Sequence, residues 1–398
     1  MKINCIGLGY VGLPTSLLLA DKNFDVIGVD SNEKKIKEIN SHNLFLNEIE
    51  LQNLYLKVIK KNNFRAQSSP EAGDVFFIVV PTPVNPDKSY DLSFLNSAVD
   101  SVIPFLKKGN ILVIESTVPV KTTQLISEKI FKERKDLKNE IYVAYCPERV
   151  LPGNTLHELK NNDRVIGGID EISTQKVINF YKKFVDGNLY EADSFTAELC
   201  KLAENSFRDN QIAFANELSI ICDELNVNVN NLIKIANKHP RVNILKPGTG
   251  VGGHCIAVDP WFLISDFPDK TNLIKKSREV NDFKTEWCIE KAISTIKEYF
   301  EINKKYPLVS CMGITYKKDS DDMRESPSLK IAKNLINQTE FETLICEPNL
   351  KSHVDFELSD HEKAYFNADI VIWLVNHKEF ESIKKIEGKK ELDFCGLN

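Results

Sequence analysis

The sequence predicts an α/β fold, with two units of parallel strands and helices joined by a long helix and a helical middle region. Three observations support this fold class. Short apolar runs alternate with helical segments over the first half of the chain, as in βαβ units. From Ser194 onward apolar residues recur at helical spacing, and new apolar runs begin at Tyr306. A chain of 398 residues is also too long for one ordinary core.

The overall composition fits a soluble globular protein. Apolar residues make up 42% of the chain and charged residues 27%, with a formal net charge of −6. This acidic balance argues against a general nucleic-acid binder, although a local basic pocket could still hold a phosphate. No apolar run approaches the ~20 residues that span a bilayer. The start, MKINCIGLGYVG, lacks the features of a signal peptide, so we expect a cytoplasmic protein without a membrane partner.

A glycine-rich turn follows the first predicted strand. The strand KINCI leads into Gly7-Leu-Gly9-Tyr-Val-Gly12, a helix follows, and the next strand, FDVIGVD, ends on Asp30. In this order the first glycine permits a tight turn, the second lets backbone approach a pyrophosphate, and the third allows close helix–strand packing. The helix N-terminus offers N–H groups to the phosphates, and Asp30 stands where a carboxylate grips ribose hydroxyls. The pattern predicts a Rossmann-type site for NAD rather than NADP, and not a structural glycine turn alone.

Three more apolar runs end in proline-bearing turns. They are DVFFIVVPTP, NILVIESTVP and IYVAYCPE, at residues 74–83, 110–119 and 141–148. Ligands of open parallel sheets lie at the carboxyl ends of the strands. We therefore expect the turns PTP, STVP and CPERVLPG to line a cofactor and substrate cleft; the alternative is that they only punctuate loops. This NAD-binding domain is predicted to span residues 1–193.

The pattern changes in the rest of the chain. A long helix begins at Ser194 and opens a helical domain, predicted for residues 194–300, which carries the loop GVGGHCIAVDPW. Lys201 and Asn205 are four residues apart and so share one face of this helix; taken alone, both fit ordinary surface residues. Beyond it, YPLVSCMGITYK, FETLICEP and ADIVIWLVNH are three further strands. They predict a smaller α/β domain over residues 301–398.

Cys255 differs from the other cysteines in its surroundings. The chain has nine cysteines, scattered singly with no CxxC pair, which predicts neither a disulfide framework nor a structural zinc site. Cys5 and Cys311 lie in apolar runs and Cys222 on an apolar helix stripe, as small hydrophobic residues do. Cys255 instead follows paired glycines and precedes Asp259. No His, Cys and carboxylate spacing matches a zinc or magnesium site, so we predict no metal.

An NAD site and an isolated cysteine leave two chemistries open. In the first, an alcohol is oxidised once and Cys255 is incidental. In the second, a Cys255 thiolate attacks an aldehyde, and the thiohemiacetal loses a second hydride to become a thioester that is hydrolysed to a carboxylate. The second needs partners for an oxyanion and a base for hydrolysis. The candidates are Lys201 with Asn205, and Glu148 or Asp259; a lysine near the thiol would also lower its pKa.

Seven motifs occur in the order found in one protein family. They are GLGYVGLP, VPTP, ESTVP, CPER, KLAENSFR, GVGGHCIAVDP and GITYKKDSDDMRESP, and the chain resembles the UDP-glucose/GDP-mannose dehydrogenase family along essentially its whole length. YCPERVLPG, NDRVIGG and ANKHPRVNILKPGTGVGGHCIAVDPWF are closest to the branch that oxidises UDP-N-acetyl-D-mannosamine to its uronate. The branch acting on UDP-N-acetylglucosamine or its galacto isomer is the nearest rival. UDP-glucose fits less well, because its enzymes carry a second glutamate where this chain has Pro152.

The resemblance implies a role for each matching residue. Cys255 is the implied nucleophile, Lys201 and Asn205 stabilise the oxyanion, and Lys201 could also accept a proton. Asp259 positions water or acts as base, and Glu148 is the general base of thioester hydrolysis. Thr117 orders water and contacts NAD; the other implied NAD contacts are Gly7, Gly9, Tyr10, Val11, Gly12, Asp30, Pro81, Thr82 and Arg324. The implied substrate contacts are Glu148, Arg149, Val150, Lys201, Asn205, Arg208, Arg241, Lys246, Gly250, Gly252, Gly253, His254, Tyr316 and Lys317.

The same resemblance has consequences for assembly and for the cysteine loop. Arg241 is implied to reach the substrate of a neighbouring subunit, which predicts at least a homodimer. The loop glycines are expected to leave room for substrate, and His254 is expected to be a contact rather than the base. Ala257 stands where many relatives have proline. Cys395 stands where relatives carry the arginine of a DTRG-like stretch, so no contact is carried over there.

Three hypotheses about function follow. The first is a four-electron nucleotide-sugar dehydrogenase that reduces two NAD per sugar and supplies a uronate for polysaccharide biosynthesis. The second is a two-electron hydroxyacid-type dehydrogenase with the same glycine motif. The third is a non-catalytic protein that binds a nucleotide sugar. The joint presence of Cys255, Lys201, Asn205, Glu148 and Asp259 favours the first.

Overall fold

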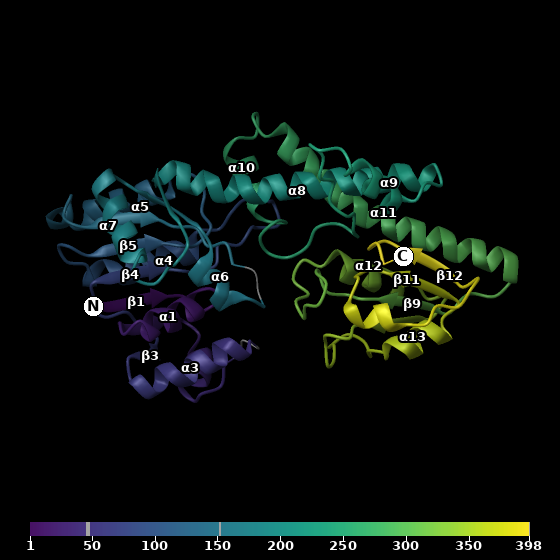
Figure 1. The fold of residues 1–398 in the computed structure, drawn as a ribbon, viewed down its shortest axis with the longest axis horizontal. Helices are drawn as coiled ribbons and strands as arrows, with labels where there is room; N and C mark the ends of the chain where they lie inside the picture. The colour runs from purple at the N-terminus through teal and green to yellow at the C-terminus, as the bar shows by residue number, and fades with distance from the viewer. Residues whose placement is uncertain (45–47, 151–152, 398) are drawn as a thin grey trace. The chain divides into compact units, whose positions relative to one another are not determined.

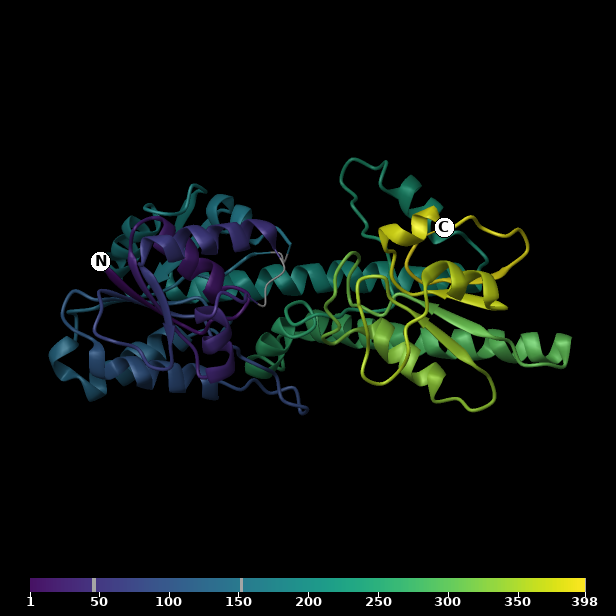
Figure 2. The same cartoon turned by 90° about the horizontal axis from the view of Figure 1, so that it is seen from below.

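The computed structural model describes residues 1–44, 48–150 and 153–397. They form two compact units, which divide after Ala203, within the long helix α8 (Ser194–Glu224). Each unit contains a sheet of largely parallel strands with helices on both faces (Figure 1, Figure 2). The predicted α/β fold class is therefore confirmed. The three-domain division with boundaries at 193 and 300 stays a prediction.

The sheet of the first unit has, within the described residues, eight strands in the order β3-β2-β1-β4-β5-β6-β7-β8. Neighbouring strands are parallel except for β6 and β7. The strand order reverses between β1 and β4, and ligands of doubly wound sheets bind at such a reversal. The strands are β1 Lys2–Ile6, β2 Asp25–Val29, β3 Phe64–Gln67, β4 Val75–Ile78, β5 Ile111–Ile114, β6 Tyr142–Tyr145, β7 Arg164–Gly168 and β8 Leu189–Asp193.

The inner strands of this sheet are largely apolar, and successive side chains point to opposite faces. Apolar side chains therefore lie on both faces of the sheet, and both faces are buried. Ile3 and Cys5 of β1 pack on one face with α1, α3, α6 and α7, while Phe76 and Ile78 of β4 pack on the other with α4 and α5. Continuous apolar runs are typical of parallel strands covered on both sides. The helices are α1 Gly12–Asp21, α2 Glu33–Asn40, α3 Ile49–Lys61, α4 Ser93–Val102, α5 Thr122–Glu133, α6 Thr155–Asn161 and α7 Glu171–Tyr181, with 3₁₀ turns η1 Ile103–Phe105 and η2 Lys135–Leu137.

The connection from β1 to α1 depends on glycine. Gly7 has a φ of +99°, and a Cβ on Gly12 would lie 1.8 Å from the carbonyl oxygen of Gly7. A side chain would strain the first position and clash at the second. A Cβ on Gly9, by contrast, would meet nothing within 4 Å. The turn therefore brings the N-terminus of α1 to the carboxyl edge of the sheet and leaves open space beside Gly9.

The first half of the second unit contains helices of very different lengths and no strand among the described residues. Helix α11 runs over Asn272–Asn303, and α9 (Val229–Ala236) and α10 (Asp259–Asp266) lie between α8 and α11 in the sequence. Buried polar side chains join α8 to α11: Arg278 Nη1 and Asn281 Nδ2 donate to Asp209 Oδ1 at 2.7 and 2.8 Å. The helical stretch predicted from the apolar spacing is present, and its last helix ends at Asn303.

The second sheet has the strand order β10-β9-β11-β12, and its neighbouring strands are parallel. Helices α11 and α12 cover one face, and α13 and the 3₁₀ turn η3 cover the other. Here the order reverses between β9 and β11. The elements are β9 Val309–Met312, α12 Pro327–Ile336, β10 Thr343–Cys346, α13 His361–Asn367, β11 Ile370–Trp373, η3 Lys378–Ser382 and β12 Lys390–Asp393.

None of the helices in the described part of the chain combines the length and the apolar character needed to cross a bilayer.

Candidate active site

The glycine turn and Asp30 form the dinucleotide end of the first unit. Asp30 follows β2, and its Oδ2 accepts the N–H of Leu8 at 3.0 Å and pairs with Lys35 Nζ at 2.7 Å. The carboxylate that the sequence assigns to the ribose is thereby held beside the glycine turn. Tyr10 is exposed and Val11 partly buried in the same turn. Open space beside Gly9 and backbone N–H groups at the start of α1 fit a pyrophosphate.

The turns after β4 and β5 lie against each other. Thr82 Oγ1 donates to the carbonyl oxygen of Thr117 at 2.7 Å, and Ser116 Oγ donates to that of Val80 at 2.7 Å. These bonds join the PTP and STVP turns at the carboxyl edge of the sheet. Of the three residues assigned to NAD here, Pro81 is exposed, and Thr82 and Thr117 are partly buried.

The turn after β6 places Glu148 in a buried ion pair. Its Oε2 accepts Arg164 Nη1 at 2.8 Å, with side-chain exposures of 9% for Glu148 and 1% for Arg164. Its Oε1 accepts the N–H of Arg149 at 2.6 Å, and its carbonyl oxygen accepts Lys201 Nζ at 2.8 Å. Three residues predicted for the site, Glu148, Arg149 and Lys201, are therefore brought together in the first unit. Val150 follows directly, whereas Pro152 lies outside the described residues.

Glu115 is a buried carboxyl group near Glu148 and Arg164 that the sequence analysis did not assign to the site. Glu115, buried just after β5, accepts a 2.5 Å hydrogen bond from Tyr181 on its Oε1, and its Oε2 has no partner within the described residues. Burial raises the pKa of Glu115 to about 7; Arg164 opposes this rise and Glu148 adds to it. Glu115 stands in the motif ESTVP and Arg164 in the motif NDRVIGG. Neither motif indicates that its charged residue is buried.

The second unit brings Cys255 together with two of its predicted partners. Cys255 lies in a turn just before α10, and its carbonyl oxygen accepts the N–H of Asp259, the first residue of that helix, at 2.8 Å. Asp259 Oδ2 accepts Asn205 Nδ2 at 2.5 Å. Asp259 and Asn205 are buried, whereas Cys255 is partly exposed. A thiol, an amide and a carboxylate thus occur in one small region.

The glycines before Cys255 allow the chain to pack closely on itself. Gly250 has a φ of +136°, and a Cβ there would lie 2.5 Å from Thr285 Oγ1. Gly253 has a φ of +79°, and a Cβ there would lie 2.9 Å from the ring of Tyr316. A Cβ on Gly252 would likewise meet the Glu325 carbonyl oxygen at 2.6 Å. The protein's own atoms fill the space beside these glycines, so the predicted room for substrate there stays a prediction.

Tyr316 and Arg324 lie beside the cysteine loop within the second unit. The Arg324 carbonyl oxygen accepts the N–H of Gly253 at 3.0 Å, while its guanidinium pairs with Asp322, with Nη2 at 2.6 Å from Oδ2. Burial raises the pKa of Tyr316, and Asp322 and Cys255 add to the rise. The predicted contact of Arg324 with NAD stays a prediction.

The remaining predicted contacts lie at the surface. Arg208, Lys246 and His254 are exposed, and so is Arg241, whose N–H donates to His239 Nδ1 at 3.3 Å. Lys317 is partly buried in the segment after β9, where its carbonyl oxygen accepts Thr315 Oγ1 at 3.1 Å. Their assigned roles stay predictions.

One group of side chains has the composition of a metal site. Asp319, His377 and Glu379 offer ligand atoms within 4.8 Å of one another. Both ring nitrogens of His377 are engaged, however: Nδ1 accepts the N–H of Asp319 at 3.0 Å, and Nε2 lies 3.1 Å from Glu347 Oε2. A ring nitrogen already in a hydrogen bond is a poor metal ligand. We assign no metal here, and the absence of a metal stays a prediction.

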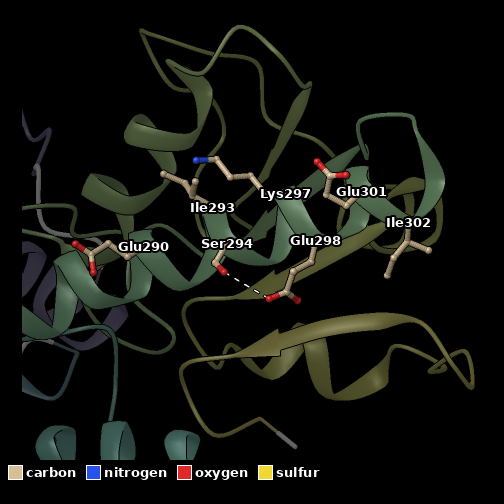
Figure 3. A pocket seen from close by; sticks show the side chains of 7 residues that line it. All are labelled: Glu290, Ile293, Ser294, Lys297, Glu298, Glu301 and Ile302. Carbon is tan, nitrogen blue, oxygen red and sulfur yellow. Dashed lines mark hydrogen bonds between the residues drawn. The ribbon is translucent and has the colours of Figure 1, made fainter.

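A surface hollow along α11 lies outside the candidate site. Figure 3 shows its lining side chains, with Ser294 Oγ donating to Glu298 Oε1 at 3.5 Å. The residues that line it all belong to α11: Glu290, Ile293, Ser294, Lys297, Glu298, Glu301 and Ile302. None of them is a predicted site residue, and a single helix face offers no converging polar groups.

Comparisons with known proteins cover the same regions. Three models of the UDP-glucose/GDP-mannose dehydrogenase family match: the NAD binding domain at residues 1–185, the central domain at 195–283 and the UDP binding domain at 310–395. An NDP-N-acetyl-D-galactosaminuronic acid dehydrogenase of Ralstonia solanacearum is 42% identical over 99% of this chain and 96% of its own. A UDP-N-acetyl-D-mannosamine dehydrogenase of Campylobacter jejuni is 42% identical over 99% of both chains.

The fold has close solved counterparts. A structure of the UDP-N-acetyl-mannosamine dehydrogenase Cap5O from S. aureus superposes with a TM-score of 0.89 at 38% identity, covering 100% of this chain and 99% of that one. The match extends over the glycine turn, the long helix and the cysteine loop. With NAD as the cofactor of its N-terminal domain, this chain belongs to the UDP-glucose/GDP-mannose dehydrogenase family.

Proposed function

We propose that this chain oxidises the C6 hydroxymethyl group of a UDP-N-acetylhexosamine to a carboxylate, with UDP-N-acetyl-D-mannosamine as the leading substrate and two NAD reduced per sugar. The observation that carries the proposal is the joint placement of Cys255, Asn205 and Asp259 in the second unit. A cysteine four residues before a carboxylate that accepts a hydrogen bond from an amide suits covalent capture of an aldehyde. The names of the relatives from C. jejuni and S. aureus support the substrate class.

The first unit would hold the cofactor. NAD⁺, when bound, accepts the hydride that each oxidation releases. The open space beside Gly9 and the N–H groups at the start of α1 would receive the pyrophosphate. Asp30, fixed by Leu8 and Lys35, would accept hydrogen bonds from the ribose hydroxyls.

Cys255 would form the covalent intermediate. Its thiolate adds to the C6 aldehyde carbon, and the aldehyde oxygen becomes the oxyanion of a thiohemiacetal. Asn205 Nδ2 carries two hydrogens; one is committed to Asp259, which fixes the direction of the other. We propose that this second N–H donates to the oxyanion. Lys201 is proposed for the same role, with its ammonium group already held by the Glu148 carbonyl.

Hydrolysis would complete the reaction. Loss of hydride from the thiohemiacetal carbon leaves a thioester; water then adds, the C–S bond breaks, and the uronate and the Cys255 thiolate are released. The water gives up two protons: the one lost as it attacks goes to a carboxylate base, for which Glu148 and Asp259 are the alternatives, and the other leaves the new carboxylic acid for solvent. Both oxygens of Glu148 already accept hydrogen bonds, which orient it. Asp259 is likewise oriented by Asn205.

The sugar and the assembly are proposed from the relatives and from the family resemblance. The R. solanacearum relative is named for an N-acetyl-D-galactosaminuronic acid, which supports the galacto or gluco isomer as the alternative; UDP-glucose comes last. Arg241 is proposed to reach the active site of a second copy in a homodimer, and its exposure in the described chain is compatible with that role. A cytoplasmic site and a place in polysaccharide biosynthesis are proposed from the resemblance alone.

The decisive experiment counts NADH per sugar consumed for a panel of UDP-N-acetylhexosamines. We expect about two NADH per sugar, because the thioester route contains two oxidations. A ratio of about one would favour the two-electron dehydrogenase. Binding of every UDP-sugar without turnover would favour the non-catalytic binding protein.

The nucleophile can be tested in the same assay. Cys255→Ala should abolish uronate formation while UDP-sugar binding remains measurable, since the thiol is required only for the covalent steps. Cys395→Ser is the matched control, because Cys395 lies after β12, outside the candidate site, and it should leave turnover unchanged. Normal uronate production by Cys255→Ala would contradict the proposed role of the thiol.

A further inference from the structure

A buried histidine–glutamate pair in the second unit has no part in the proposed reaction. His377 follows β11 and Glu347 follows β10, and both side chains are 0% exposed. His377 Nε2 lies 3.1 Å from Glu347 Oε2. Burying a carboxylate costs free energy unless hydrogen bonds compensate. The hydrogen bonds of this pair therefore show which segment of the chain the pair holds in place.

The hydrogen bonds of His377 define its tautomer. Its Nδ1 accepts the N–H of Asp319 at 3.0 Å and is 3.0 Å from Asn349 Nδ2. Because two donors face Nδ1, the ring proton resides on Nε2 and is donated to Glu347. Burial alone would raise the pKa of Glu347, but the hydrogen bond from His377 and those from backbone N–H groups hold it below its ordinary value. The pair is therefore an imidazole whose Nε2–H donates to the Glu347 carboxylate.

The pair holds both ends of one short segment. Glu347 Oε2 accepts the N–H of Ile314 at 2.8 Å and that of Thr315 at 3.1 Å, while His377 accepts the N–H of Asp319. Thr315 Oγ1 lies 3.3 Å from His377 Nε2 and donates to the carbonyl oxygen of Lys317. Residues 314–319, with Lys317 near their centre, are thus fixed by side chains from the two loops that follow β10 and β11.

This segment lies at the reversal of strand order in the second sheet. The reversal falls between β9 and β11, and 314–319 follow β9 directly. Gly313, at a φ of +89°, brings this connection so close to the one after β11 that a Cβ there would lie 2.6 Å from Val375 Cβ. Nucleotides bind to doubly wound sheets at such a position.

We propose that His377 and Glu347 are positioning residues for the nucleotide sugar: they fix residues 314–319 so that Lys317 is correctly placed before the ligand arrives. A segment ordered in advance loses less conformational freedom on binding, so affinity is higher. The inference rests on the proposed function, specifically on the contact between Lys317 and the UDP-sugar. It assigns no contact with the reacting atoms to either residue.

The test measures UDP binding by calorimetry, and steady-state kinetics with the UDP-N-acetylhexosamine that the full-length protein oxidises. His377→Asn removes the Nε2–H donor to Glu347, and Glu347→Gln removes the charge that the donors stabilise. We expect each substitution to raise the Kd for UDP and the KM for the sugar about tenfold, as loss of ordering hydrogen bonds does. The kcat and the KM for NAD should change by less than about twofold, because neither residue is assigned a contact with NAD or with the thiol.

His361→Asn is the matched control, since His361 opens α13 in the same sheet domain and is partly exposed. Thr315→Val is a milder variant that removes the hydroxyl contacts to the Lys317 carbonyl oxygen and to His377 Nε2 but leaves the His377–Glu347 pair intact. Unchanged UDP affinity in folded variants, or a fall in kcat at constant KM, would overturn the positioning role. Failure of all three variants to fold would overturn it in favour of a purely structural one. If the unmodified protein does not bind UDP, the proposed function fails as well.

Discussion

Glu115 combines deep burial with an incomplete set of hydrogen bonds. Burial raises its pKa from 4.5 to about 7, so the folded state holds a proton on Glu115 at pH values where the unfolded chain has released it. Stability linked to this group is fully present below about pH 4.5. It declines as the pH rises toward 7, because the unfolded state then binds fewer protons than the folded state.

Replacing Glu115 by glutamine should therefore flatten the pH dependence of stability. The glutamine side chain would remain neutral and could still accept the hydrogen bond from Tyr181. We expect Glu115→Gln to change stability little at pH 5 and to raise the free energy of unfolding by up to about 3 kcal/mol at pH 8, because folding raises the pKa of Glu115 from 4.5 to about 7. Urea unfolding at both pH values measures the effect. Glu140→Gln, at an exposed position, is the control; equal changes in both variants would contradict the prediction.

The contrast between Cys255 and Glu115 shows which single residues can be found in a sequence. Cys255 is recognisable because glycines precede it and Asp259 follows it closely in the sequence. In the structure the backbone N–H of Asp259 donates to the Cys255 carbonyl oxygen. The bond from Asn205 to Asp259 joins residues 54 apart in the chain, and no local spacing indicates it. Glu115 and Arg164 were not predicted, because charged residues are mostly exposed and nothing in the local sequence shows that Glu115, just after β5, and Arg164, the first residue of β7, are buried.

At the scale of elements, a buried polar seam joins α8 and α11. Asp209 is 0% exposed and Arg278 3% exposed, and their ion pair measures 2.7 Å. Burial raises the pKa of Asp209, and Arg278 opposes that rise. Asn281 donates to the same aspartate and accepts from Asn216. The Asn216 side chain in turn accepts the N–H of Gly248 at 2.8 Å, so the seam also supports the start of the glycine loop.

Removing one partner of this seam should destabilise the second unit. Arg278→Ala leaves the Asp209 carboxylate buried without its cation, a change that costs about 3–5 kcal/mol. We expect a lower urea midpoint for Arg278→Ala and recovery of most of the loss in the double variant Asp209→Leu/Arg278→Met, which has no buried charge. Lys276→Ala, on the same helix in an exposed pair with Glu279, should leave the urea midpoint nearly unchanged. A similar midpoint shift for both single variants would refute the role of the buried pair.

The elements that the sequence predicts are those with strong apolar patterns. VFFI, ILVI and IVIW lie in the apolar runs predicted as strands, and they form β4, β5 and β11. The sequence analysis did not identify the inner strand RVIGG, which forms β7, nor the edge strands FRAQ, LYEAD and KELD, which form β3, β8 and β12. The edge strands carry little apolar pattern because an edge strand pairs on one side only, and its pairing is determined by the neighbouring strand rather than by its own residues.

At the scale of the whole molecule, each of the two sheets reverses its strand order at one point. We assign one ligand to each reversal: NAD to the first and, as proposed above, the nucleotide sugar to the second. The first unit has its own core and the glycine turn for NAD, and the second has its own core and the Lys317 segment for the nucleotide sugar. Substitutions at one reversal should therefore alter one binding equilibrium without altering the other. The glycine turn provides a matched pair of positions for testing this separation.

Gly9→Val and Gly12→Val should impair the protein in different ways: the first should weaken NAD binding, and the second should lower thermal stability. A Cβ on Gly9 meets nothing within 4 Å, so valine should leave the melting temperature nearly unchanged while filling the space for the pyrophosphate. We expect the Kd for NAD to rise at least about tenfold, or about 1.4 kcal/mol, with the Kd for UDP unchanged. A Cβ on Gly12 would lie 1.8 Å from a carbonyl oxygen, so Gly12→Val should lower the melting temperature. Parallel loss of NAD and UDP binding in a stable Gly9→Val protein would contradict this prediction and show that the two binding equilibria are coupled.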